Sequence, residues 1–200
     1  DRAIAADPET VARVAAAYSQ GRRAGGVQPT VKHFPGLGGV RGDTHLVQAR
    51  LDLPLAALQR QWLPFRTVAG HGGAAMMLGH VLVPALDPRR PASLSRAVAD
   101  DLLRRQWGYR GLLLTDDLNM GAVYGEGVDR AATAALDAGV DLILVAYDPD
   151  QYYRALHGAA QAWRRGAIDA GREVASAERL ARMNAGAVPN GPGYRLLQKE

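Results

Sequence analysis

A glycine-rich segment near the start of the chain, residues 32–45 (KHFPGLGGVRGDTH), holds the side chains best suited to acid–base chemistry. It places a lysine, two histidines and an aspartate around a loop directly after an apolar run. Glycines let backbone approach a ligand closely. Asp43 and His45 stand two residues apart, so the carboxylate can hold one imidazole nitrogen and fix which nitrogen carries the proton. A simple aspartate turn is the alternative for this pair.

A second segment could supply a nucleophile. The apolar residues 112–114 are followed by Thr115 and then by two adjacent carboxylates, Asp116 and Asp117. One of the two could cap a helix amino terminus. We do not expect both to be capping residues, because adjacent carboxylates repel each other and are costly to bury in part.

Three further residues are candidate ligands for a substrate. Lys32 is one of two lysines in a chain that otherwise uses arginine, which suggests a need for a compact ammonium group at the end of a strand. His33 follows it and is either a ligand or a buried, hydrogen-bonded histidine. His80 comes directly after another apolar run. On the residues alone, Arg2 is uninformative.

A zinc site is the competing interpretation, because histidines and aspartates on loops bind metals. The sequence has no His-x-x-x-His or His-x-His pair and no cysteine. We therefore expect no metal and no cofactor.

The composition indicates a globular protein. Of its 200 residues, 48% are hydrophobic and 22% are charged, and no apolar stretch is long enough to suggest a membrane span. The net charge of +4 comes from scattered arginines without a long basic run, so we expect neither a nucleic-acid nor a membrane partner. The start of the chain has no signal-peptide pattern. We expect a cytoplasmic protein, with secretion or attachment to the envelope as open alternatives.

Apolar periodicity predicts strands that alternate with helices. Strands are expected over residues 27–33, 74–78, 111–115 and 140–146, and helices over residues 7–25, 55–69, 93–108, 128–138, 150–166 and 174–187. This order is typical of a parallel sheet covered by helices. In such folds the loops after the strands form the active face, which is where the candidate residues fall.

The number of predicted strands bears on the domain organisation. A closed eight-stranded barrel takes roughly 250 residues, whereas this chain offers four strand–helix units. We expect residues 1–200 to form a single domain, the carboxy-terminal portion of a (β/α)8 barrel, with residues 188–200 as a tail. Two open sheet edges would remain.

The motif of residues 32–36 (KHFPG), followed by residues 42–45 (GDTH), resembles a signature of glycoside hydrolase family 3. The likeness is to its branch of bacterial β-N-acetylglucosaminidases (β-hexosaminidases). It continues through five more motifs in the same order: MLGHV at 77–81, PALD at 84–87, PASLS at 91–95, GYRG at 108–111 and TDDLNM at 115–120. Leu37 departs from the family, which usually has a histidine there, so we expect altered loop packing.

The resemblance implies a TIM-type barrel and retaining hydrolysis of terminal β-N-acetylglucosaminides from cell-wall sugars. It aligns Asp116 with the nucleophile, His45 with the acid/base and Asp43 with its partner. The remaining matches are positions expected to bind the sugar: Arg2, Lys32, His33 and His80.

Other outcomes stay open at this point. A neutral imidazole repels an incoming anion less than a carboxylate does, so phosphorolysis of the same linkage is one alternative. A second is a sugar-binding or inactive fragment. A third is an interaction module that completes its barrel with another chain, which would involve self-association.

Overall fold

The computed structural model describes residues 4–40, 47–125 and 127–186. The described elements, in chain order, are α1 (Pro8–Ala24), β1 (Thr30–Phe34), β2 (Ala49–Arg50), α2 (Leu55–Gln61), α3 (Leu63–Gly70), β3 (Ala75–Leu78), β4 (Val81–Val83), β5 (Asp87–Pro91), the short 3-10 turn η1 (Ala92–Leu94), the π-helix η2 (Ala97–Gln106), β6 (Leu113–Asp117), α4 (Gly121–Tyr124), α5 (Val128–Ala138), β7 (Leu142–Leu144), α6 (Asp150–Arg164) and α7 (Ala170–Gly186). Within these residues, no helix combines the length and hydropathy needed to cross a bilayer.

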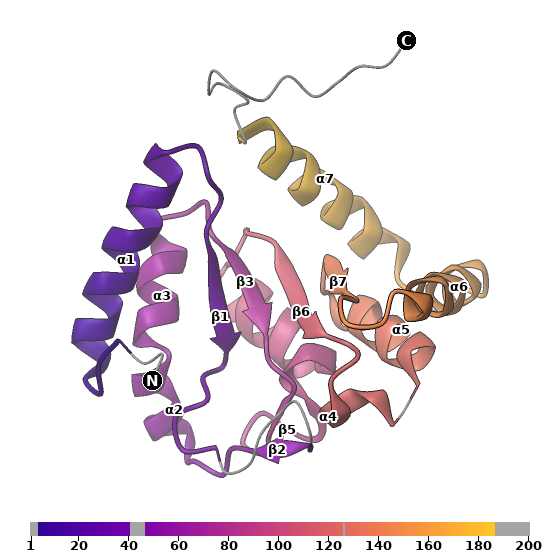
Figure 1. The fold of residues 1–200 in the computed structure, drawn as a ribbon, viewed down its shortest axis with the longest axis horizontal. Helices are drawn as coiled ribbons and strands as arrows, with labels where there is room; N and C mark the ends of the chain where they lie inside the picture. The colour runs from indigo at the N-terminus through magenta and orange to yellow at the C-terminus, as the bar shows by residue number, and fades with distance from the viewer. Residues whose placement is uncertain (1–3, 41–46, 126, 187–200) are drawn as a thin grey trace.

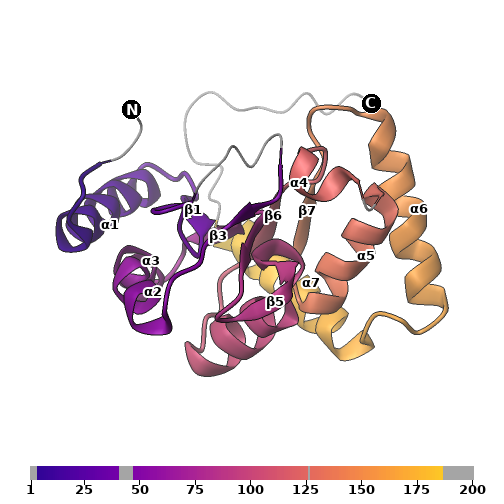
Figure 2. The same ribbon diagram turned by 90° about the horizontal axis from the view of Figure 1, so that it is seen from below.

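A parallel sheet of four strands is the centre of the fold. Its order is β1-β3-β6-β7, and every neighbouring pair is parallel. Helices α1 and α3 lie beside its β1 edge and α5 and α6 beside its β7 edge (Figures 1 and 2). The predicted α/β class with four parallel strands in chain order is confirmed. Because all four strands run in one direction, their carboxyl ends share one end of the sheet.

A second, smaller sheet was not predicted. It has the order β2-β4-β5, in which β2 and β4 are parallel and β4 and β5 are antiparallel. Strand β2 has two residues, and β5 has the sequence DPRRP, so neither shows the apolar alternation by which a strand is recognised. This sheet lies near the carboxyl ends of the main strands (Figure 1).

Local signals explain where some of the helices begin and end. The carboxylate of Asp7 accepts a hydrogen bond from the Thr10 amide at 2.7 Å and caps α1. Helix α5 ends at Gly139, whose φ of 101° favours glycine. The single helix predicted over residues 55–69 is instead two helices that meet at Trp62. Pro64, in the first turn of α3, has no amide hydrogen to continue the α2 hydrogen-bond ladder.

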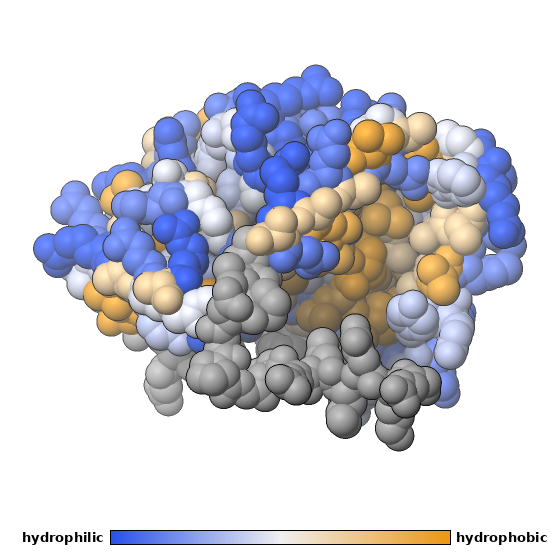
Figure 3. Space-filling view, turned by 90° about the horizontal axis from the view of Figure 1, so that it is seen from above, coloured by the Kyte–Doolittle hydropathy of each residue, from blue (hydrophilic) through white to orange (hydrophobic). Residues whose placement is uncertain are grey.

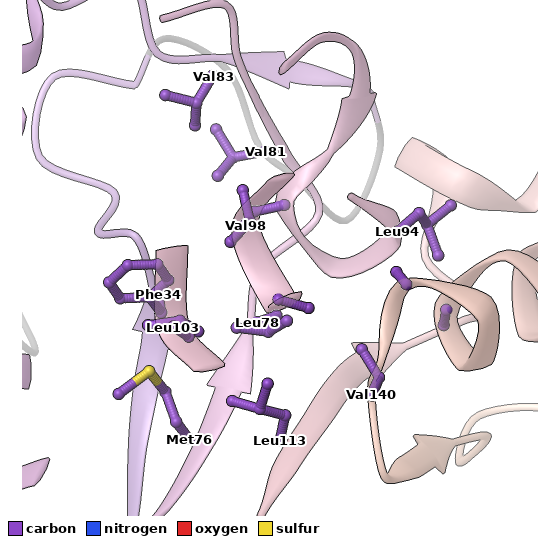
Figure 4. Close-up of a cluster of buried hydrophobic side chains, with 14 of the residues drawn as sticks. Phe34, Met76, Leu78, Val81, Val83, Leu94, Val98, Leu103, Leu113 and Val140 are labelled. Carbon is purple, nitrogen blue, oxygen red and sulfur yellow. The ribbon is translucent and has the colours of Figure 1, made fainter. Parts of the chain in front are cut away.

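The core lies between the main sheet and η2. Phe34, Met76, Leu78 and Leu113 from the sheet meet Leu103 and its neighbours on η2 (Figure 4). The Phe34 ring packs edge-on to Trp107 at a centroid distance of 5.4 Å. This packing fixes the end of β1, the strand that carries Lys32 and His33.

A buried ion cluster ties α7 to the sheet. The Asp141 side chain is fully buried at the start of β7. Its Oδ2 accepts from Arg104 Nη2 at 2.6 Å and from the Leu113 amide at 2.8 Å. Its Oδ1 accepts from Arg179 of α7 at 2.9 Å. Burial lowers the pKa of Arg104, and the neighbouring Asp141 carboxylate opposes that effect.

Candidate active site

His33 and Asp116 come together across the carboxyl end of the main sheet. His33 lies in β1 and Asp116 in β6, on the two sides of β3. The distance from His33 Nε2 to Asp116 Oδ2 is 3.4 Å, and the two side chains are 20% and 16% exposed. The pair is therefore sheltered yet reachable from solvent. The sequence placed both residues in the candidate site, and the structure brings them into contact.

A glycine between the two strands makes this contact possible. Gly79 follows β3, and a Cβ atom added to it would lie 3.2 Å from the Cβ of His33. A side chain at this position would press against the imidazole. The absence of one lets His33 cross the end of β3 toward Asp116.

The adjacent aspartates have different surroundings. The Asp117 carboxylate accepts amide hydrogens from three residues, each at 3.1 Å: Asn119 and Ala146 at Oδ1, and Tyr147 at Oδ2. It thereby joins the end of β6 to the loop after β7. Asp116 Oδ1 accepts the Asp117 amide at 3.0 Å, while its Oδ2 is directed to His33. Both oxygens of Asp117 are used by the backbone, in loop bridging rather than in the helix capping considered for one of the pair, whereas Asp116 keeps one oxygen directed to His33.

His80 is buried behind this pair. It is 1% exposed, with its Nε2 2.9 Å from the Asp117 carbonyl and its Nδ1 2.6 Å from Ser93 Oγ. A carbonyl only accepts, so we assign the proton to Nε2, and Nδ1 then accepts from the serine hydroxyl. Burial lowers the pKa of His80, against the opposing effect of the Asp117 carbonyl and the Asp116 carboxylate. The ring is therefore neutral and holds the end of β6 in place.

This geometry favours a positioning role for His80, because both of its ring nitrogens are engaged inside the protein. The assignment of His80 as a sugar ligand stays a prediction. The sequence offers its partner Ser93, or else Ser95, as the cap of the helix predicted over residues 93–108. That role falls to Ser95, whose Oγ lies 3.4 Å from the Val98 amide of η2. Only the closeness of PASLS to the MLGHV motif hinted that Ser93 belongs to the site.

The remaining predicted residues are not brought into a described contact. Lys32 is exposed beside His33 in β1. Arg2, Asp43 and His45 lie outside the described residues. Their assigned roles stay predictions.

Two further features bear on what the site can bind. Within residues 4–40, 47–125 and 127–186, no three His, Cys, Asp or Glu side chains gather as a metal site would require. A cavity of about 650 Å³ is lined by Gln28, Trp107 and Arg179 among others, at the opposite end of the strands from Asp116. Arg179 is engaged by Asp141 there. The candidate site is thus the open rim around His33 and Asp116.

Several known proteins are similar to this chain in sequence. The family model described as the glycosyl hydrolase family 3 N-terminal domain matches residues 1–183. A β-hexosaminidase of Neisseria meningitidis serogroup C is 40% identical over 152 residues, which are 75% of this chain and 42% of that protein. A β-hexosaminidase of Xanthomonas oryzae pv. oryzae is 41% identical over 149 residues, 74% of this chain and 44% of that protein.

Solved structures agree with the sequence matches. The family 3 β-N-acetylglucosaminidase of Paenibacillus sp. str. FPU-7 superposes with a TM-score of 0.89 at 36% identity, over 95% of this chain and 37% of that one. The chain spans less than half the length of the two β-hexosaminidases. Its four-stranded sheet is part of the TIM-like barrel of such domains, as predicted. The chain therefore belongs to glycosyl hydrolase family 3, through that family's N-terminal domain.

Proposed function

We propose that this chain carries the catalytic residues of a retaining β-N-acetylhexosaminidase that acts on terminal β-N-acetylglucosaminides, such as muropeptide-like sugars. One observation carries the proposal. Asp116 is a sheltered carboxylate at the carboxyl end of the sheet, with one oxygen directed to His33, while the adjacent Asp117 is used by the backbone. The names of the relatives support this substrate class.

The proposed reaction has two steps. In the first, an Asp116 oxygen attacks the anomeric carbon, the bond to the leaving oxygen breaks, and His45 as imidazolium gives that oxygen its proton. In the second, neutral His45 takes a proton from water, and the water oxygen displaces Asp116 from the anomeric carbon. Asp43 holds the imidazole and stabilises its charged form. Lys32, His33 and Arg2 bind the sugar hydroxyls.

Substitution of the two aspartates tests the assignment of the nucleophile. Asp116→Ala is expected to lower turnover of an aryl N-acetyl-β-glucosaminide by about a thousand-fold or more. The matched control is Asp52→Ala, which removes an exposed carboxylate paired with Arg50. Turnover by Asp116→Ala near that of the control would contradict the role of Asp116.

The acid/base assignment has its own test. His45→Ala is expected to slow a substrate with a poor leaving group much more than one with a good leaving group, which needs little protonation. Equal losses with both substrates would count against His45. A fluorinated slow substrate should label the protein at Asp116, as seen by mass spectrometry of peptides. A folded chain that gains no label would favour the sugar-binding or inactive alternative.

The acceptor and the assembly are also open to measurement. Release of N-acetylglucosamine 1-phosphate in phosphate buffer would identify phosphorolysis, whereas free N-acetylglucosamine would identify hydrolysis.

Among the described strands, β1 and β7 each pair on one side only in the main sheet, and we propose these edges as the places where further barrel strands pair. Light scattering tests self-association through them. The single domain and the cytoplasmic location stay predictions, and cell fractionation tests the latter.

A further inference from the structure

Three exposed tyrosines follow β7 within seven residues, at the carboxyl end of the sheet where Asp116 lies. Tyr147 is 88% exposed, Tyr152 53% and Tyr153 72%. The Tyr152 and Tyr153 rings, in the first turn of α6, meet edge-on with a centroid distance of 5.4 Å. Single exposed aromatics are ordinary, but a group of them beside a candidate site is typical of a binding surface.

The backbone that carries Tyr147 is fixed to the same strand as Asp116. The Asp117 carboxylate accepts the amides of Ala146 and Tyr147 at 3.1 Å each. With the Asn119 amide oriented so that its oxygen faces the loop, that oxygen accepts the Asp148 amide at 2.9 Å. A short turn at the end of β6 thus holds three consecutive residues of the β7–α6 connection. The Tyr147 ring is presented to solvent on a constrained backbone, which lowers the entropy lost when a ligand binds.

The tyrosines contribute little to the fold, in contrast to another tyrosine of the chain. Tyr109 is buried, and its hydroxyl donates to the Ala74 carbonyl at 2.6 Å. Tyr147, with nearly nine-tenths of its surface in water, buries almost no apolar area. Its position beside Asp117 is therefore better explained by contact with a ligand than by packing.

We propose that Tyr147, supported by the Tyr152–Tyr153 pair, is an aromatic platform for the sugar on the leaving-group side of the scissile bond. This inference rests on the proposed function, because cleavage of a terminal residue leaves only that side of the bond for further sugar. A β-linked pyranose with equatorial substituents presents axial C–H groups on its faces, and an aromatic ring covers such a face well. The tyrosines accordingly select glycans over glycosides with small leaving groups.

Two substrates that share the same terminal sugar separate this role from the chemistry. N,N′-diacetylchitobiose has a second sugar to stack, whereas N-acetyl-β-D-glucosaminyl azide has none. Tyr147→Ala is expected to lower kcat/KM about ten-fold for the disaccharide and to leave the azide within about two-fold. Tyr147→Phe should retain the disaccharide preference, because the ring remains. Tyr18→Ala is the matched control, since it removes a 65% exposed ring on α1.

The outcomes distinguish this inference from the proposed function. Turnover of the azide with no loss of disaccharide preference in Tyr147→Ala would overturn the platform and leave the hydrolase intact. Absence of turnover with both substrates would count against the proposed function instead. In that case, titration of the chain with diacetylchitobiose, followed by NMR of labelled tyrosine rings, still tests whether the tyrosines bind the sugar. Shifts confined to Tyr147, Tyr152 and Tyr153 would support the platform, and unchanged tyrosine signals would refute it.

Discussion

Replacement of Asp117 by alanine should destabilise the rim of the site without removing the reacting groups. The carboxylate accepts three backbone amides, from Asn119, Ala146 and Tyr147. Hydrogen bonds to charged groups contribute roughly 1.5–3 kcal/mol each when sheltered. Water would replace part of this contribution when the carboxylate is removed, because the loop after β7 is exposed. About 1 kcal/mol per bond is then reasonable, or about 3 kcal/mol in all.

Asp117→Asn provides a graded comparison. The asparagine oxygen can take the place of Oδ1, which accepts two of the amides, but its NH2 group would face the Tyr147 amide, donor against donor. We expect a loss of about 1 kcal/mol, one third of that for alanine. In a chain of this size each kcal/mol shifts Tm by roughly 2–4 °C. Alanine should therefore lower Tm by about 6–12 °C and asparagine by about 2–4 °C.

Thermal unfolding followed by circular dichroism measures both variants beside Asp52→Ala, for which we expect no clear change because that carboxylate is exposed. Activity should fall in parallel, since the β7 loop and the Asp116 backbone lose their common anchor. A Tm of Asp117→Ala equal to that of the control, or a Tm of Asp117→Asn below that of Asp117→Ala, would contradict this role of the carboxylate.

Three further predictions concern the scaffold. Asp141→Asn should lower the free energy of unfolding by about 3 kcal/mol or more, because Arg104 and Arg179 would lose their buried counter-charge. Denaturant unfolding measures this free energy, and a loss under about 1 kcal/mol would contradict the prediction. Gly158→Ala should cost about 1–3 kcal/mol, because the new Cβ would lie 2.9 Å from backbone atoms of α5, and an unchanged Tm would argue against that close packing. Wild-type stability should fall as the pH drops below about 6.5, where unfolded His80 gains a proton that the buried ring resists. His80→Gln should flatten that dependence of Tm on pH, and an equal slope in both proteins would show that other groups cause it.

The fold was predictable where local chemistry decides it. The Asp7 side chain caps the start of α1, and the left-handed backbone of Gly139 ends α5. The smaller sheet was missed because β2 and β5 form through pairing with β4, and neither strand has an apolar periodicity of its own that would predict it. Strand β7 begins two residues later than expected, at Leu142. The preceding Asp141 is occupied by arginines that are distant in sequence.

Within the described residues, the contact between His33 and Asp116 could be predicted from the sequence, whereas the hydrogen-bond partners of Asp117 and His80 could not. His33 and Asp116 stand at the ends of parallel strands, so their meeting follows from the topology. Which of the two adjacent aspartates is used by the backbone depends on the loop after β7. The loop residues Ala146 and Tyr147 are 29 and 30 positions from Asp117 in sequence and reach it only in the folded chain. The same holds for the link between His80 and Ser93. Contacts of this kind have no signature in sequence spacing.

The attachment of α7 through Arg179 has a practical consequence for anyone who shortens this chain. A stop codon placed in the connection after α6 would remove Arg179, one of the two counter-ions of the buried Asp141 carboxylate. Arg104 alone would then have to balance that charge. Fragments that end before residue 179 should aggregate or fail to accumulate when expressed. A minimal version for crystallisation should retain α7 through at least that arginine.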